Sequence, residues 1–350
     1  MTPPNVILAP NWRSMDELFS DAEFARLKDM ATLIWAEDAP IPQDILQTAL
    51  PKAEVLIAAE PVVTRETLDS APRLKAVIEV SGAFPSTVDY AACFERGIHV
   101  LSCAPGFREA VAEMALGLTI AGGRGMVAQH EAFRRGEEHW LADRTGEDFT
   151  LFGQALGFIG FGQIARETLR LMAPFRPDVK VYDPWLPDDV AAAHGVALGP
   201  LDEVLSHSRC LHIAATPTAE NRAMIGADEL ARLPDAALVV LISRAHLVDF
   251  DALLAEVETG RIRAAIDVFP SEPVAPDHAL RQMPGLILSP HRAAAVEGGR
   301  HLIGRLICDD LKRIFRGDRP EGLLLADPGK VALLAGVGDA AQVAAMADAR

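Results

Sequence analysis

Three residues in the second half of the chain carry side chains suited to acid–base chemistry on a small acid. Arg244, Glu272 and His291 each lie shortly after a short apolar run. A guanidinium pairs with a carboxylate through two hydrogen bonds, and an imidazolium can protonate a carbonyl oxygen while a hydride reaches the carbon. A carboxylate beside the imidazole holds its orientation and favours its charged form. These groups together are what the reduction of a 2-oxo acid requires.

Each of these residues also has an ordinary structural interpretation. An arginine after a strand is commonly solvated or ion-paired, Glu-Pro is a common turn, and one histidine among ten is commonly a surface or core residue. All three residues follow predicted strands, and ligands of open α/β sheets bind outside the carboxyl ends of the strands. This shared position favours a role in ligand binding or catalysis over the structural interpretation.

A glycine-rich turn provides the second chemical pattern, Gly160-x-Gly162-x-x-Ala165, between an apolar run and an amphipathic stretch. The first glycine makes the tight turn, the second lets the backbone approach a pyrophosphate, and the small third residue allows close packing. Asp183 ends the next apolar run, where a carboxylate accepts hydrogen bonds from a ribose hydroxyl. Because its charge repels a 2′-phosphate, the pattern predicts NAD rather than NADP as the cofactor.

The elements that must position these groups alternate between short apolar runs and helix-compatible stretches. This order predicts an α/β fold with two parallel-sheet units. Strands of the first unit are expected at residues 5–9, 31–35, 54–59, 76–80 and 98–101. Strands of the second are expected at residues 155–160, 179–183, 210–214, 238–242, 264–268 and 286–289. A long helical stretch at about 109–135 separates them, and Gly122, Gly123 and Gly125 are expected to bend or interrupt it.

Composition restricts the partners. The 350 residues include 33 Lys and Arg against 49 Asp and Glu, a net charge of −16. Such a chain lacks the cationic face that nucleic acids and anionic membranes require, so we expect neither partner. No apolar run reaches the roughly 18–20 residues that span a bilayer, and the N-terminus lacks a signal-peptide pattern. The four cysteines are scattered and form no CxxC pair, which indicates core residues in a reducing cytoplasm and predicts no metal site. They are Cys93, Cys103, Cys210 and Cys308.

Segments between about Ser81 and Arg316 resemble the D-isomer-specific 2-hydroxyacid dehydrogenase family, whose members use NAD. The segments that carry the resemblance are residues 81–100, 110–125, 156–166, 244–273 and 286–295. The last two are the most specific, since ordered Arg, Asp-Val-Phe, Glu-Pro and Pro-His rarely occur together by chance.

The resemblance implies two Rossmann/flavodoxin-like domains with parallel sheets, the cofactor domain being inserted into the substrate (catalytic) domain. The substrate domain is expected at residues 1–106 and 296–330, the NAD-binding domain at 107–295, and a C-terminal tail at 331–350. The family's active site lies in the cleft between its domains. Beyond about residue 325 the sequence shows no core pattern, and we expect a surface helix or a loose tail there.

The resemblance also implies residue roles. Arg244 would anchor the substrate carboxylate, His291 would be the acid/base, and Glu272 its partner. The backbone N–H groups of Gly82 and Ala83 would be offered to the substrate carboxylate. Within the cofactor site, Gln163 and Ile164 would face the diphosphate, Asp183 the adenosine ribose and Asp267 the nicotinamide carboxamide. The complete expected cofactor set is Gly160, Gly162, Gln163, Ile164, Asp183, Ala215, Asn221, Ile242, Ser243 and Asp267.

Some positions depart from the family pattern. Ala245 stands where the family usually has glycine after the catalytic arginine, and Phe84 replaces a glycine of the substrate loop. Arg292 follows His291, where the family tends to be apolar or small. If Arg292 points inward, the substrate carries a second anionic group; if it turns outward, it pairs with a surface acid such as Glu297.

We therefore expect an NAD-dependent oxidoreductase that interconverts a small 2-hydroxy acid and its 2-oxo acid. A homodimer is expected through the wide apolar face of residues 109–135. Two alternatives stay open: a non-catalytic NAD(H)-responsive binding protein on the same fold, and a dehydrogenase of phosphite- or formate-like anions. Glu272 is compatible with phosphite oxidation, whereas formate sites prefer glutamine at that position.

Overall fold

The computed structural model describes residues 3–140 and 147–334, which divide into two compact units. Unit 1 consists of Met1–Glu109 and Ala294–Arg350, and unit 2 of Ala110–Ala293, so the second unit is inserted into the chain of the first. The chain passes from one unit to the other at 109/110 and at 293/294, within three residues of the expected domain boundaries. The expected tail lies outside the described residues from 335 onward, and its beginning belongs to α14 (Pro328–Leu334).

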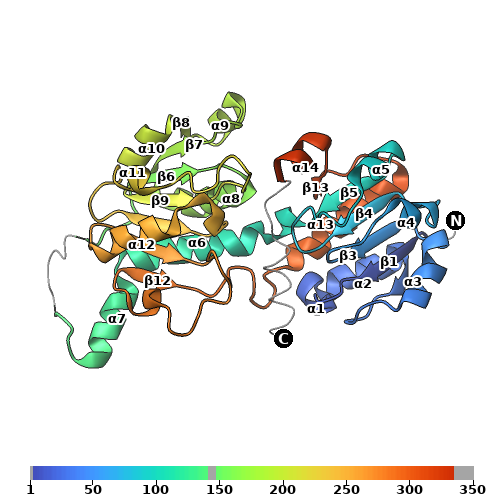
Figure 1. The fold of residues 1–350 in the computed structure, drawn as a ribbon, viewed down its shortest axis with the longest axis horizontal. Helices are drawn as coiled ribbons and strands as arrows, with labels where there is room; N and C mark the ends of the chain where they lie inside the picture. Colours follow the sequence, from blue (N-terminus) through green and yellow to red (C-terminus); the bar gives the residue numbers. More distant parts are fainter. Residues whose placement is uncertain (1–2, 141–146, 335–350) are drawn as a thin grey trace. The chain divides into compact units, whose positions relative to one another are not determined.

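Unit 1 is built on a six-stranded sheet in the order β13-β5-β4-β3-β1-β2 (Figure 1). The first five strands pair in parallel, and β13 pairs antiparallel with β5. Strands β3 and β4 are buried at every residue, which is why they are continuous apolar runs in the sequence. The strands are β1 (Asn5–Ala9), β2 (Thr32–Trp35), β3 (Val55–Ala58), β4 (Ala76–Glu79), β5 (His99–Ser102) and β13 (Leu324–Leu325).

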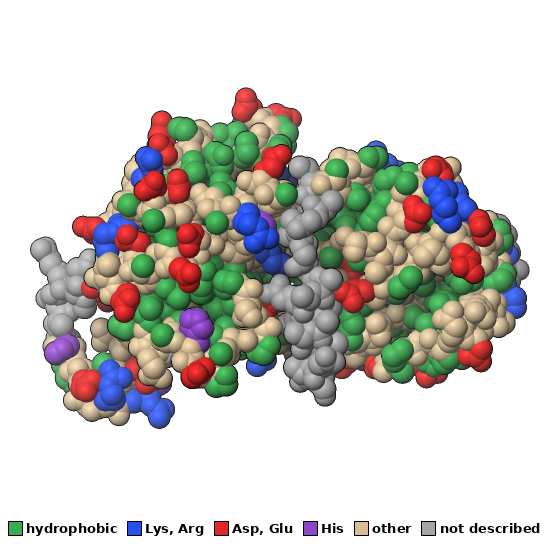
Figure 2. Space-filling model, viewed as in Figure 1, with side chains coloured by type: hydrophobic (Ala, Val, Ile, Leu, Met, Phe, Trp, Pro, Cys, Tyr) green, Lys and Arg blue, Asp and Glu red, His purple; other side chains and the backbone are tan. Residues whose placement is uncertain are grey.

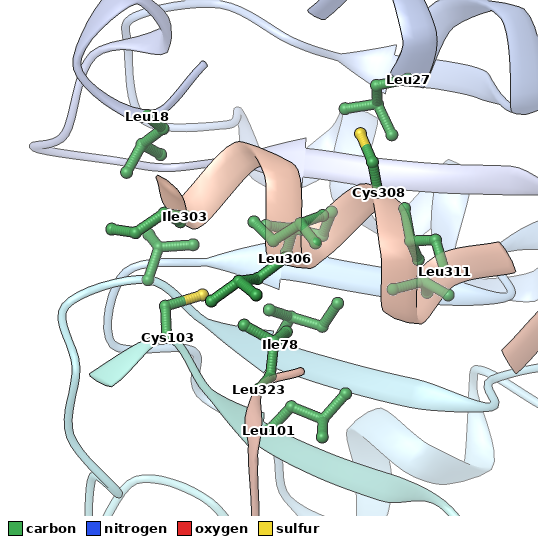
Figure 3. Packing of buried hydrophobic residues seen from close by; sticks show 14 of the residues in the cluster. Leu18, Leu27, Ile78, Leu101, Cys103, Ile303, Leu306, Cys308, Leu311 and Leu323 are labelled. Carbon is green, nitrogen blue, oxygen red and sulfur yellow. The ribbon is translucent and has the colours of Figure 1, made fainter. Parts of the chain in front are cut away.

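Helix α13 (His301–Arg316) provides a large part of the core of unit 1. Figure 3 shows it lying over the sheet, with Leu306 directed toward Ile78 of β4 and Cys308 directed toward Leu27 of α2. Its buried residues recur at helical spacing, so one face of the helix packs while the other stays polar. The other helices of the unit are α1 (Met15–Leu18), α2 (Asp21–Met30), α3 (Gln43–Ala49), α4 (Arg65–Asp69), α5 (Tyr90–Glu95) and the 3-10 turns η1 (Leu50–Lys52) and η2 (Ala104–Phe107).

The short strand β13 was not expected from the sequence. The buried carboxylate of Asp310 accepts hydrogen bonds from the backbone N–H groups of Glu321, Gly322 and Leu323, at 2.9, 3.0 and 2.8 Å. These bonds fix the segment that leads into β13, and Ala326 behind it is buried. The core of unit 1 therefore reaches Ala326, although the sequence shows no core pattern beyond about residue 325, and α14 follows it.

Unit 2 contains a seven-stranded parallel sheet in the order β12-β11-β10-β9-β6-β7-β8. The strand order reverses between β6 and β9, the position where open α/β sheets bind ligands. The two-residue strand β8 was not expected, since so short a strand has no periodicity to detect. The strands are β6 (Ala155–Ile159), β7 (Asp178–Tyr182), β8 (Ala197–Leu198), β9 (Cys210–Ile213), β10 (Leu238–Leu241), β11 (Arg263–Ile266) and β12 (Leu286–Leu288).

The helical stretch that precedes this sheet is interrupted, as its glycines predicted. Helix α6 (Arg108–Gly123) ends before Gly125, which takes a left-handed φ of 59° and precedes α7 (Met126–Arg135). The remaining helices of unit 2 are α8 (Gln163–Met172), α9 (Asp188–Ala193), α10 (Leu201–His207), α11 (Ala227–Leu230), α12 (Phe250–Glu258) and the 3-10 turns η3 (Ala173–Phe175), η4 (Ala245–Leu247) and η5 (Ala279–Gln282).

The surface is rich in acidic side chains, which are scattered over the face drawn in Figure 2. The four cysteines are buried and unpaired. Within residues 3–140 and 147–334, no helix combines the length and apolar character needed to cross a membrane.

A buried histidine lies at the centre of the unit 2 sheet. The ring of His212 stacks on Phe158, with 4.8 Å between centroids and 16° between planes. Its Nε2 lies 3.3 Å from Thr119 Oγ1 and 3.5 Å from Cys210 Sγ. Burial lowers the pKa of His212 to about 3, so the imidazole is neutral in the folded protein at any pH near neutrality.

This burial predicts a loss of stability in mild acid. In the unfolded chain His212 has an ordinary pKa near 6.5, so below that pH the unfolded state binds a proton that the folded state rejects. Lowering the pH from 7.5 to 5.5 should therefore remove about 1.4 kcal/mol of unfolding free energy through this one residue. Urea unfolding of wild type and of His212→Gln at both pH values measures this loss. The unfolding free energy of the variant should fall by about 1.4 kcal/mol less than that of wild type. Equal losses would show that His212 does not control the acid response.

Candidate active site

The carboxyl edge of the unit 2 sheet brings the expected catalytic groups to one side. Leu241 of β10 pairs with Ile266 of β11, and Ile266 pairs with Leu288 of β12, so the three strands end level with one another. Arg244 and His291 follow the outer two of these strands at the same edge. The register therefore groups residues that are far apart in the sequence.

Glu272 and His291 form a short hydrogen bond. His291 Nδ1 lies 2.6 Å from Glu272 Oε2, and Glu272 Oε1 accepts a hydrogen bond from the N–H of Phe269 at 2.8 Å. The Glu272 side chain is 8% exposed and that of His291 is 30% exposed. The buried carboxylate thus fixes Nδ1 and leaves Nε2 as the ring nitrogen that can exchange a proton with a ligand.

Asp267 holds the backbone around His291. Its fully buried carboxylate accepts hydrogen bonds from the N–H groups of Arg292 at 2.9 Å and Ala293 at 3.1 Å, and from the hydroxyl of Ser289. His291 itself has a φ of 52°, a left-handed conformation that is strained for a residue with a side chain. Asp267 therefore stabilises the turn that directs the imidazole to Glu272. Asp267 was expected to contact the nicotinamide carboxamide. In the structure its carboxylate is buried and already accepts hydrogen bonds from this turn.

Arg244 lies in extended backbone after β10, with a φ of −150° and a half-buried side chain. Its Nη1 donates to the carbonyl of Ser243 at 2.8 Å. The hydroxyl of Ser243 donates to the carbonyl of Ile213 on the adjacent strand at 3.0 Å, and Ile242 is buried. These contacts attach the segment before Arg244 to the sheet. Among the described residues, the Arg244 side chain has one hydrogen-bond acceptor, so most of its guanidinium donors can reach a carboxylate ligand.

The glycine-rich turn has the geometry that a dinucleotide needs. Gly160 has a φ of 82°, and a Cβ on it would lie only 2.4 Å from the Cα of Ala215, so only glycine fits. Gly162 faces open space, with no atom within 4 Å of an added Cβ. Helix α8 begins directly after it, with no side-chain cap and no acidic residue in its first turn. Its N–H groups, at Gln163 and Ile164, fit the diphosphate of NAD.

Asp183 is bound to the same turn. Its Oδ2 accepts the N–H of Phe161 at 2.8 Å, and its Oδ1 accepts the N–H of Trp185 at 3.1 Å. The carboxylate therefore places a fixed negative charge beside the turn, as a ribose-binding residue must.

The side-chain amide of Asn221 binds the backbone of its own loop. Its side chain is buried, with Oδ1 accepting the N–H of Thr218 and Nδ2 donating to the carbonyl of Thr216, both at 2.8 Å. His246 adds a contact that the sequence did not reveal, with its Nε2 2.7 Å from the carbonyl of Thr218. Both side chains shape the loop that follows β9, which includes Ala215.

In unit 1, the N–H groups expected for the substrate carboxylate already have an acceptor. Gly82 and Ala83 both donate to Glu79 Oε2, at 2.8 and 2.9 Å, and Ser81 donates to Oε1 at 2.6 Å. Burial raises the pKa of Glu79, while these hydrogen bonds oppose the rise. The sequence offered one signal for this residue, a charged side chain inside the apolar run 76–80. In the parts of the chain that the structure describes, no cluster of three His, Cys, Asp or Glu side chains could hold a metal ion.

Comparison with known proteins identifies the family. Residues 116–293 match the model of the D-isomer specific 2-hydroxyacid dehydrogenase NAD-binding domain. The D-3-phosphoglycerate dehydrogenase of Methanocaldococcus jannaschii is 31% identical over 277 residues, covering 78% of this chain and 52% of that protein. The glyoxylate reductase of Korarchaeum cryptofilum is 27% identical over 304 residues, covering 85% of this chain and 90% of that protein. The chain thus spans about half the length of the first of these relatives.

Solved structures agree with the sequence matches. A phosphoglycerate oxidoreductase from Rhizobium etli is 33% identical, with a TM-score of 0.82, and the match covers 93% of this chain and 98% of that one. The chain belongs to the D-isomer specific 2-hydroxyacid dehydrogenase family, and unit 2 is its NAD-binding domain.

Proposed function

We propose that this protein is an NAD-dependent dehydrogenase that interconverts a small 2-hydroxy acid and its 2-oxo acid, with reduction as the favoured direction. The observation that carries the proposal is the 2.6 Å hydrogen bond between Glu272 and His291, at the sheet edge where Arg244 also emerges. The relatives named as phosphoglycerate dehydrogenase and glyoxylate reductase support a small acid as the substrate class. A cytoplasmic location, inferred from the four unpaired cysteines, is part of the proposal.

Each residue has a chemical role in the proposed reaction. NADH bound at the glycine-rich turn supplies the hydride for the carbonyl carbon. Arg244 binds the substrate carboxylate and so orients the carbonyl group. His291 donates a proton from Nε2 to the carbonyl oxygen, and Glu272 stabilises the imidazolium before the transfer. Asp267 holds the turn in which the imidazole stands.

The proposal is tested with purified protein, NADH and a panel of 2-oxo acids that includes glyoxylate, hydroxypyruvate and 2-oxoglutarate. Saturable NADH oxidation with at least one of them supports it. Tight NADH binding without turnover on any 2-oxo acid would favour the non-catalytic binding protein. Oxidation of phosphite or formate alone would favour the dehydrogenase of such anions.

Replacement of the acid/base should remove most of the turnover. We expect His291→Ala to lower kcat by about 10²- to 10⁴-fold, the usual contribution of a positioned proton donor, while NADH affinity stays near wild type. Steady-state kinetics and a fluorescence titration of NADH measure the two quantities. The exposed His278→Ala serves as the matched control. Near-normal turnover of His291→Ala would exclude His291 from the proton transfer.

Asp183 should select NAD over NADP. We expect wild type to bind NADPH at least tenfold more weakly than NADH, because a 2′-phosphate would meet a fixed carboxylate. Asp183→Ala should narrow that ratio, whereas Asp189→Asn, an exposed acid on α9, should leave it unchanged. Titration of NADH and NADPH into the three proteins measures this affinity ratio. Equal affinity of wild type for the two cofactors would contradict this role.

We further propose a homodimer that forms through α7 and the residues around it. This part of unit 2 exposes large apolar side chains, among them Met126, Val127, Phe133 and Trp140. Light scattering at micromolar concentration should give twice the 37.6 kDa chain mass, and Phe133→Glu should give the monomer mass. Val62→Glu, on an exposed apolar residue of unit 1, should stay dimeric. A monomeric wild type would contradict the proposed assembly.

A further inference from the structure

One side chain of unit 2 joins two loops that the proposed chemistry uses. His246 follows Arg244 by two residues, at the carboxyl edge of the unit 2 sheet, and is half-buried. Its Nε2 lies 2.7 Å from the carbonyl oxygen of Thr218, in the loop between β9 and α11. Because a carbonyl oxygen can only accept a hydrogen bond, Nε2 carries the proton and the ring is the donor.

The backbone of His246 holds the far end of the same loop. Its carbonyl accepts a hydrogen bond from the N–H of Ala223 at 2.8 Å, and the carbonyl of Leu247 accepts one from the N–H of Ile225 at 3.1 Å. Ala223 has a φ of 51°, a left-handed conformation that costs free energy for a residue with a side chain. His246 therefore binds the loop 216–223 at two points, and a substitution can remove the side-chain bond while the backbone bond stays.

Inside the loop, both backbone hydrogen-bonding groups of Thr218 are occupied. Its N–H donates to Asn221 Oδ1 at 2.8 Å, and its carbonyl accepts from His246. Asn221 Nδ2 also donates to the carbonyl of Thr216 at 2.8 Å. Thr218 and Asn221 are each 6% exposed, so loss of the imidazole leaves the carbonyl of a buried residue without its donor. Such a loss costs more than the loss of a hydrogen bond on the surface.

The same loop lies beside the glycine-rich turn. Ala215 comes directly before it, and a Cβ on Gly160 would lie 2.4 Å from the Cα of Ala215. The turn and the loop follow β6 and β9, the neighbouring strands at which the strand order reverses. At the base of the loop, the hydroxyl of Ser243 donates to the carbonyl of Ile213. A shift of the loop would therefore reach the cofactor turn on one side and the segment of Arg244 on the other.

We infer that His246 is a positioning residue that fixes the loop 216–223 against the segment that carries Arg244. The affinity for the cofactor and the affinity for the substrate carboxylate then depend on one side-chain hydrogen bond. The inference rests on the proposed function, which assigns NADH to the glycine-rich turn and the substrate carboxylate to Arg244.

Three substitutions separate the hydrogen bond from the bulk of the ring. His246→Gln keeps an N–H donor at about the reach of Nε2, His246→Asn carries the same amide one methylene shorter, and His246→Leu has no donor. Glu220→Gln, an exposed side chain of the same loop, is the matched control. Circular dichroism and urea unfolding establish that each variant is folded. If His246→Leu does not fold, the comparison of His246→Gln with His246→Asn decides the question.

Binding measurements on the full chain test the inference without relying on turnover. NADH is titrated by fluorescence, and oxalate, which imitates the carboxylate and carbonyl of a 2-oxo acid, by calorimetry. His246→Leu and His246→Asn should weaken both ligands by about 3- to 10-fold, the size of one hydrogen bond, while His246→Gln and the control stay within twofold of wild type. A weakening of only one ligand or of neither, a wild type that fails to bind either one, or a His246→Gln as weak as His246→Asn would overturn the inference.

Steady-state kinetics adds a measurement that a general loss of stability would not change. His246→Leu should raise KM for the 2-oxo acid by about 3- to 10-fold and leave kcat within twofold of wild type, because it weakens substrate and transition state equally. His291 is oriented by Glu272 and Asp267, so its proton transfer should not depend on His246. A lower kcat with an unchanged KM would contradict the positioning role. A wild type inactive on every 2-oxo acid would refute the proposed function, while the two binding affinities would still decide the role of His246.

Discussion

The geometry of the proposed catalytic site depends on one buried carboxylate, that of Asp267. It accepts two backbone N–H groups and one hydroxyl from the segment 289–293, and so holds His291 in a left-handed conformation. Such a conformation costs on the order of 1–3 kcal/mol for a residue with a side chain, which the three hydrogen bonds to a buried charge can offset. The result is an imidazole whose Nδ1 meets Glu272 at 2.6 Å. Without this turn, the imidazole of His291, the proposed acid/base, would have no fixed direction.

The sheet of unit 2 makes that arrangement possible. Parallel strands that end level with one another bring Arg244, Asp267 and His291 to one edge, although they span almost fifty residues of sequence. At the switch in strand order, Gly160 and Gly162 leave the N-terminus of α8 open for a diphosphate. The same topology therefore positions the groups proposed for proton transfer and those proposed for cofactor binding.

The sequence predicted the parts of the fold that rest on periodicity and on strong local signals. The eleven apolar runs became strands whose bounds differ from the expected ones by no more than two residues, and Gly125 interrupted the helical stretch between α6 and α7. The strands β8 and β13 were missed because two residues carry no periodic pattern. Their position after predicted strands led to Arg244, Glu272 and His291, and the family resemblance added their expected roles. The structure shows that Glu272 and His291 are joined by a hydrogen bond.

Contacts from side chains to backbone were the hardest to foresee. Asp267, Glu79 and Asn221 all have carboxylate or amide groups that serve the chain's own loops. Residue type alone does not separate such a role from ligand binding, because both use the same hydrogen-bonding groups. Only the path of the loop shows which N–H groups lie within reach.

The transfer of an isotopic label tests the central claim most directly. Wild-type protein is incubated with NADH deuterated at the transferable C4 position and with a 2-oxo acid, and the 2-hydroxy acid is analysed by mass spectrometry. The account predicts one deuterium at C2 of the 2-hydroxy acid. A protein that binds the labelled cofactor but yields no labelled 2-hydroxy acid with any member of the panel would contradict it.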